Sequence, residues 1–107
     1  MEYGVGPINQ GATMRRYVIE RAIPEIGSAD REALKGAAAQ SNGVLSAMQS
    51  EGKGIQWEHS YVASDKTFCI YVAEHADLIA EHAERSGFSA TTVTDIGKII
   101  DPTTANG

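Results

Sequence analysis

The stretch "IQWEHSYVASDKTFCIYVA", residues 55–73, predicts two β-strands joined by a tight turn. Its two apolar runs, at about 55–63 and 66–73, flank Ser64 and Asp65, and so short a connection is typical of an antiparallel hairpin. The stretch also holds the only tryptophan and the only cysteine of the chain. The helices and the other two strands of the fold can be assigned on either side of this hairpin in the sequence.

A helical pattern lies on each side of the hairpin. Before it, apolar side chains recur at alternating spacings of four and three residues, and Ser28 or Asp30 can cap the helix. The buried stripe of this helix would consist of Leu34, Ala38, Ser41, Leu45 and Met48. After the hairpin, residues 75–87 predict a second helix that ends at Gly87, a residue suited to a C-cap. Its buried face would consist of Ala76, Ile79, Ala80 and Ala83.

Two further strands complete the pattern, at 14–23 and 91–101, and each ends next to a proline. The order βαββαβ predicts an α+β fold of the ferredoxin-like sandwich type, in which two helices cover one face of a four-stranded antiparallel sheet. We expect this domain to span residues 14–103. Residues 1–13 would form a flexible leader, and residues 104–107 would form a flexible tail.

On the central strands, the side chains that point to one face of the sheet and those that point to the other face both include several apolar residues. Tyr17 and Ile19 alternate with Val18 and Ala22, while Phe68, Ile70 and Val72 alternate with Cys69 and Tyr71. This pattern is typical of strands that are buried on both faces, yet the helices cover only one face. Because an exposed apolar sheet face is an aggregation hazard, we expect a homodimer that buries the second face.

Composition excludes several classes of protein. The chain has 107 residues, of which 42% are hydrophobic, and this length suits one domain. The formal net charge of -5 and the lack of a basic patch argue against a nucleic-acid partner. No apolar run approaches the roughly 20 residues that cross a bilayer, and no secretory signal is visible. We therefore expect no membrane partner and a cytoplasmic location.

One predicted strand carries an indole, an imidazole and a phenol, which are side chains able to take part in binding or catalysis. In regular alternation, Trp57, His59 and Tyr61 project from the same face. They could pack at a dimer interface, with His59 bonded to backbone, because aromatic residues are enriched there. Alternatively, His59 could be a metal ligand or a proton carrier in a pocket that the aromatic rings shape.

Other candidate groups are dispersed along the chain. Glu20 lies inside a central strand, so it should be ion-paired, metal-bound or shifted in pKa. Cys69 cannot form an internal disulfide, and its place inside a strand predicts a reduced, mostly buried thiol. His75 and His82 are two helical turns apart, roughly 10.5 Å, which is too far to hold one ion. A metal site would therefore need ligands from different elements or subunits.

Four stretches together resemble a family of small bacterial proteins that is labelled a domain of unknown function and has nickel-binding members. They are "RRYVIERAIPE" (15–25), "QSNGVL" (40–45), "WEHSYVASDKTFCIYVA" (57–73) and "EHAERSGFSATTVTDIGKIIDPT" (81–103). Their most specific elements are W-x-H-S-Y and E-H-A. The resemblance implies a dimeric α+β barrel, in which two sheets face each other. It also implies that His59 and His82 occupy motif positions, whereas His75 does not.

The resemblance implies binding of nickel, through His59 and His82, with ligands from different elements or subunits. Glu20, Trp57, Tyr61 and Cys69 would lie around this site. Imidazole suits several divalent transition metals, so the residue types alone do not select nickel. The alternative is a cofactor-independent enzyme, similar to an oxygenase or isomerase, that binds a small molecule in a cavity between sheet and helices. A third possibility is a purely structural dimer.

Overall fold

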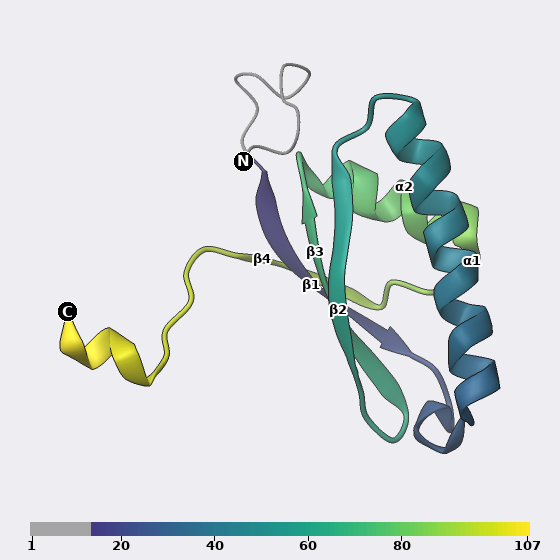
Figure 1. Ribbon diagram of the computed structural model, residues 1–107, viewed down its shortest axis with the longest axis horizontal. Coiled ribbons are helices and arrows are strands. Elements are labelled where there is room, and N and C mark those ends of the chain that lie inside the picture. The colour runs from purple at the N-terminus through teal and green to yellow at the C-terminus, as the bar shows by residue number, and fades with distance from the viewer. Residues whose placement is uncertain (1–13) are drawn as a thin grey trace.

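The computed structural model describes residues 14–107, which form a four-stranded sheet and two α-helices. Figure 1 shows the helices beside the sheet. The strand order is β2-β3-β1-β4, and every neighbouring pair is antiparallel. The described elements, in chain order, are β1 (Arg15–Ala22), η3 (Ile26–Ser28), α1 (Arg31–Ser50), β2 (Ile55–Val62), β3 (Lys66–Ala73), α2 (Ala76–Ser86), β4 (Thr92–Ile96) and η4 (Pro102–Asn106). The predicted α+β architecture with the order βαββαβ is confirmed.

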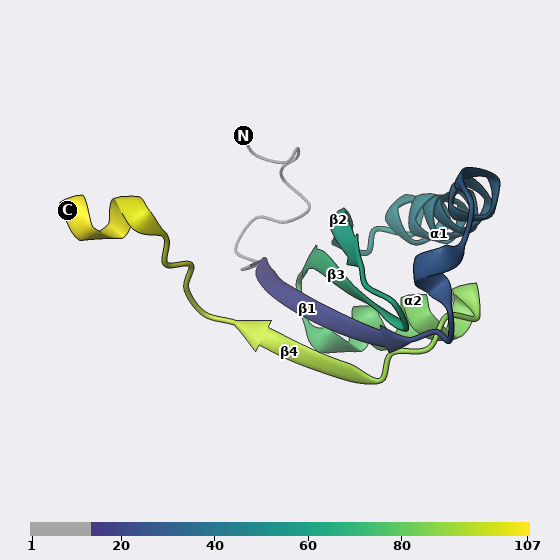
Figure 2. The same ribbon diagram turned by 90° about the horizontal axis from the view of Figure 1, so that it is seen from below.

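The two long helices lie on the same side of the sheet, as Figure 2 shows. The side chains of β1 and β3 alternate between this covered face and a face that no described helix covers. Tyr17 and Ile19 are buried beneath the helices, whereas Val18 and Ile70 are half-buried on the other side. We call the second side the open face. The expectation that both faces of the central strands are apolar is confirmed.

The helix ends follow the local signals in the sequence. The Asp30 side chain accepts a hydrogen bond of 2.9 Å from the Ala33 N–H at the start of α1, which satisfies one of the unpaired donors of the first turn. At the end of α2, Gly87 adopts a left-handed conformation with φ of 80°. This conformation suits glycine because it lacks a Cβ atom.

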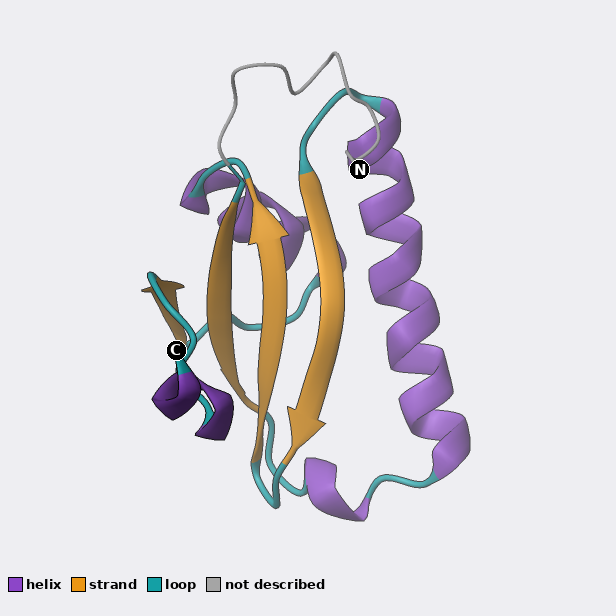
Figure 3. Ribbon diagram, turned by 60° about the vertical axis from the view of Figure 1, so that its left-hand side comes forward, coloured by secondary structure: helices purple, strands orange, loops and turns teal. Residues whose placement is uncertain are grey.

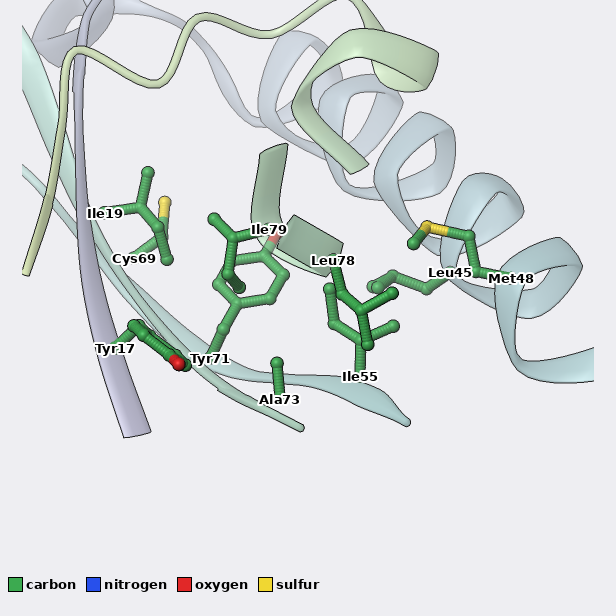
Figure 4. Packing of buried hydrophobic residues seen from close by; sticks show 10 residues of the cluster. All are labelled: Tyr17, Ile19, Leu45, Met48, Ile55, Cys69, Tyr71, Ala73, Leu78 and Ile79. Atoms are coloured by element: carbon green, nitrogen blue, oxygen red, sulfur yellow. The ribbon is translucent and has the colours of Figure 1, made fainter. Parts of the chain in front are cut away.

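The core fills the space between the sheet and the helices, as Figure 4 shows. Its largest completely buried apolar side chains come from the sheet and from both helices: Ile19, Met48, Ile55 and Ile79. Cys69 belongs to the same cluster and is a free, buried cysteine, as predicted. Burying one such aliphatic side chain contributes about 1.5–3 kcal/mol, so this cluster dominates the stability of the domain.

Helix α2 buries a face that coincides only in part with the predicted one, since Ile79 and Ala83 are buried as predicted. Ala76 and Ala80 are exposed, and the buried residues are Leu78, Ile79, His82, Ala83 and Ser86. Compared with the prediction, the helix is rotated about its axis, so that Leu78 is buried in place of the two alanines. Burying the larger leucine side chain removes more apolar surface from water. The rotation also brings His82 into the core, where the imidazole needs a hydrogen-bond partner.

The C-terminal part also differs from the prediction. Strand β4 ends at Ile96 rather than near residue 101, and Pro102–Asn106 form a short 3-10 helix. Figure 1 shows this segment running away from the sheet, and Ile99 and Ile100 are 69% and 83% exposed. The predicted leader, residues 1–13, lies outside the described residues. No helix among residues 14–107 combines the length and the apolar character needed to span a bilayer.

Helix η3 packs closely against the turn between β2 and β3, at the lower end of the sheet in Figure 3. The Gly27 N–H donates a hydrogen bond of 2.9 Å to the Ser64 carbonyl. A Cβ atom on Gly27 would lie 2.8 Å from Ser64 Cα and 2.9 Å from the Ala63 carbonyl oxygen. Both of these atoms belong to the backbone, so no side-chain rotation can relieve the clash.

Replacing Gly27 by Ala is therefore expected to lower the free energy of unfolding by about 1–3 kcal/mol, as overpacking does elsewhere. Gly36→Ala is the matched control, because Gly36 lies in α1 and the methyl group of an alanine there would meet no atom within 4 Å. The Gly36→Ala control should raise the free energy of unfolding by about 1 kcal/mol, since alanine favours the helical conformation more than glycine does. Urea unfolding of both variants measures the difference, and equal values would contradict the close packing at Gly27.

Candidate functional site

Strand β2 contains a β-bulge at the centre of its motif. Trp57 pairs with Tyr71 and His59 pairs with Ile70, so Glu58 is an additional residue on β2. The extra residue reverses the alternation of side chains after it. Trp57 therefore lies on the covered face, whereas His59 and Tyr61 lie on the open face. The prediction that these three residues share one face is wrong, because it assumed an unbroken strand.

Trp57 belongs to the packing between the sheet and α1. Its ring is stacked on that of Tyr71, with 6.3 Å between the ring centroids and 17° between the planes. Its indole Nε1–H donates a hydrogen bond of 3.0 Å to the Ser60 hydroxyl. Trp57 is thus a half-buried residue with a satisfied polar atom, and it does not contact His59 across the sheet.

His59 and Tyr61 form an exposed pair on the open face. His59 Nε2 lies 3.1 Å from the Tyr61 hydroxyl, and the two rings meet edge to face with centroids 5.1 Å apart. Tyr61 is 61% exposed. An imidazole in this position is accessible from solvent and can bind a metal ion or exchange a proton.

Two ion pairs frame the open face. Arg16 donates two hydrogen bonds of 2.9 Å to the Glu58 carboxylate, and this contact lowers the pKa of Glu58. Lys66 Nζ lies 3.1 Å from Glu20 Oε1, so Glu20 is ion-paired, which is one of the three predicted states. Between the pairs lies an apolar centre of half-buried side chains, which consists of Val18, Phe68, Ile70, Val72 and Ile96.

His82 lies on the other side of the sheet and has no exposed surface. Its Nε2 is 3.2 Å from the Ser41 hydroxyl, and its ring centroid is 5.3 Å from that of Tyr71. Its Nδ1 has no hydrogen-bond partner among the described residues. Burial lowers the pKa of His82 to about 4, and the nearby charge of Arg21 adds to the effect. The imidazole is therefore neutral at pH 7.

The structure does not bring the predicted metal ligands together within one chain. His59 is exposed on the open face, while His82 is buried among Tyr71 and Ser41 on the covered face. His75 is exposed at the start of α2, 3.8 Å from Asp77. Among residues 14–107, no group of three or more His, Cys, Asp or Glu side chains is arranged to hold a metal ion. The described part of a single chain therefore does not supply a complete metal site.

A cavity of about 240 Å³ lies between the N-terminal half of α1 and the covered face of the sheet. Trp57 and Cys69 line it, together with Ser41, which was predicted only as part of the buried stripe of the first helix, and Arg21, which was not predicted as a site residue. The sequence does contain a sign that Arg21 is unusual. In β1 every second side chain is buried, and Arg21 follows Tyr17 and Ile19 at a position where an apolar residue is expected. A charged residue in such a set indicates a special environment.

Comparison with known proteins adds a family and a fold. Residues 17–96 match a family model described as "Nickel responsive protein SCO4226-like". A solved structure, "Crystal structure analysis of SCO4226 from Streptomyces coelicolor A3(2)", has a TM-score of 0.63 and 16% sequence identity to this chain. The match covers 79% of this chain and 99% of that one. A comparison with curated protein sequences gives no match.

Proposed function

The chain belongs to the SCO4226-like family of nickel responsive proteins, and from this premise we propose that it is a nickel-binding homodimer whose metal site forms on the open face. The observation that carries the proposal is His59, an exposed imidazole on the open face of the sheet. Imidazole nitrogen is a good ligand for Ni²⁺ and for neighbouring divalent metals. The preference for nickel comes from the family description.

A second subunit is part of the proposal because the described part of one chain offers too few ligands. Residues 14–107 contain no ready cluster of three ligating side chains, and Glu58 beside His59 is held by Arg16. In a two-fold dimer, the same surface of each copy takes part in the contact. A dimer through the open face would therefore place two His59 side chains at one interface, with water completing the ligand shell.

The apolar centre of the open face supports the same dimer. Phe68, Ile70 and Val72 are only half-buried in the isolated chain, although they lie on a central strand. A second copy of the face would remove this apolar surface from water, which is the main driving force of association. The peripheral ion pairs of Arg16 and Lys66 would then form a polar rim, as is usual in protein interfaces.

His82 does not share the ion in this proposal, although the sequence motifs suggested it. It is completely buried, and the charge of Arg21, which helps to lower the pKa of His82, also opposes a metal cation there. We assign His82 to the core and His59 to the metal. This assignment predicts that replacing His59 affects nickel binding and that replacing His82 does not.

Replacing His59 by Ala is expected to weaken nickel binding at least tenfold, by analogy with the loss seen when groups around metal ligands are removed. The matched control is His75→Ala, which removes another exposed histidine and should bind nickel like the parent. His82→Leu, which keeps the site apolar, should also bind like the parent. Calorimetric titration with Ni²⁺ at pH 7 measures all three.

Two results would contradict this proposal. If the parent protein takes up no nickel, the metal-binding function is wrong. If His59→Ala titrates like the parent, the metal lies elsewhere, and a loss confined to His82→Leu would place it in the core instead. Sedimentation of the same samples, with and without nickel, shows whether the binding species is a dimer.

A further inference from the structure

The cavity beneath α1 has an apolar wall and one charged residue. Small side chains on α1, including Ala37 and Ala38, leave space above the sheet, and Leu34 on the same helix also lines it. On the sheet side, the lining includes Trp57 and Tyr71. Arg21 is the one charged side chain among the described residues that line this space. An apolar cavity with a single cation is typical of a site for an organic ligand.

Arg21 is held firmly within this wall. It is 3% exposed, and its Nη1 donates a hydrogen bond of 2.5 Å to the Ser89 carbonyl. Its guanidinium carbon lies 5.9 Å from the ring centroid of Tyr71 and 5.8 Å from that of Phe88. Cation–π contacts of this kind orient the guanidinium but leave its charge in place.

The buried charge of Arg21 has no counter-ion among residues 14–107. None of the ion pairs among residues 14–107 includes Arg21, and its Nη2 has no hydrogen-bond partner there. Burial of an unpaired charge is strongly unfavourable, and buried arginines are normally paired. The arrangement therefore calls for an anion from outside the described chain.

We propose that the cavity binds a small organic carboxylate, with its apolar body beneath α1 and its carboxylate paired with the Arg21 guanidinium. Guanidinium and carboxylate are complementary, and the guanidinium can donate two parallel hydrogen bonds. An apolar cavity of ~150 Å³ holds a benzene ring. The cavity of about 240 Å³ thus has room for a ring that carries a carboxylate. This site is on the covered face and is independent of metal binding at His59.

Benzoate is the probe, and benzamide is its neutral control of nearly the same shape. Trp57 reports binding directly, because it lines the cavity and is the only tryptophan of the chain. Titration at pH 7 should give a saturable change in tryptophan fluorescence with benzoate, and benzoate should raise the melting temperature. Benzamide should bind at least about tenfold more weakly, because it loses the charge-assisted hydrogen bonds.

Arg21→Met removes the charge and keeps the length of the side chain. This variant should bind benzoate at least about tenfold more weakly than the parent and should no longer prefer benzoate to benzamide. Without ligand, the variant should be more thermostable than the parent, because it buries no unpaired charge. Arg15→Met removes an exposed arginine from the same strand and should leave benzoate binding unchanged. Ala38→Leu fills the cavity from α1 and should abolish binding of both probes.

The proposal is overturned if benzoate gives no saturable fluorescence change, or if benzoate and benzamide bind the parent equally. It is also overturned if a folded Arg21→Met variant binds benzoate like the parent. Should that variant fail to fold, the comparison of the two probes on the parent and on Ala38→Leu decides the question alone.

Discussion

Acidification from pH 7 to pH 4 is expected to remove about 3 kcal/mol of folding stability through His82 alone. The pKa of this imidazole is about 4 in the folded protein, because it is buried and lies near the charge of Arg21. In the unfolded chain its pKa is about 6.5, the ordinary histidine value. Between these values the unfolded chain binds a proton that the folded protein excludes. Stability is therefore complete above pH 6.5 and is lost as the pH falls towards 4.

The measurement is urea unfolding of the parent and of His82→Leu at pH 7 and pH 4, at one protein concentration. Arg85 and Lys53 lower the pKa of Glu51 to about 2, so Glu51 also stabilises the fold less as its carboxyl in the unfolded chain takes up protons near pH 4, but both proteins share this loss. The parent should lose about 3 kcal/mol more than the variant. His75→Ala, which removes an exposed histidine, should behave like the parent. Equal acid sensitivity of the parent and His82→Leu would contradict a buried neutral imidazole.

Replacing Ile70 by Asp is expected to convert the proposed dimer into a monomer. Ile70 lies on β3 in the apolar centre of the open face, between Val18 and His59 on the neighbouring strands. In a dimer, the new carboxylate would be buried without a counter-ion, which costs several kcal/mol. Association should therefore weaken by more than about a thousandfold. In the separate subunit this side chain stays in contact with water, so the fold should survive.

Sedimentation over a range of concentrations checks this result. The matched control is Ala80→Asp, which places the same charge on the exposed face of α2 and should leave the dimer intact. Circular dichroism shows whether both variants are folded. A parent that is monomeric at micromolar concentration would refute the dimer, and a dimeric Ile70→Asp variant would place the contact on another surface.

The fold could be predicted because its signals are local. The hairpin turn near Asp65, the N-cap at Asp30 and the glycine C-cap at Gly87 each depend on neighbours in the sequence. Together with the apolar periodicity, they determine the order of elements. The order of elements in turn restricts the topology to few possibilities.

The candidate site was less predictable because it depends on tertiary pairing. Nothing in the residue types of β2 shows that Glu58 is a bulge, since the register is set by hydrogen bonds to β3. The rotation of α2 likewise reflects competition between the alanine face and Leu78, which only the packed core decides. Arg21 could be noticed as a charge in a buried position, but that residues 14–107 give it no counter-ion becomes visible only when its neighbours are known.

The bulge at Glu58 also means that the two halves of a short sequence motif meet different structural constraints. Trp57 and Ser60 line the cavity on the covered face, so their replacement is limited by the space beneath α1. His59 and Tyr61 are exposed on the opposite face, where any binding partner would select them. A related chain could therefore replace His59 and Tyr61 while keeping Trp57 and Ser60, or the reverse.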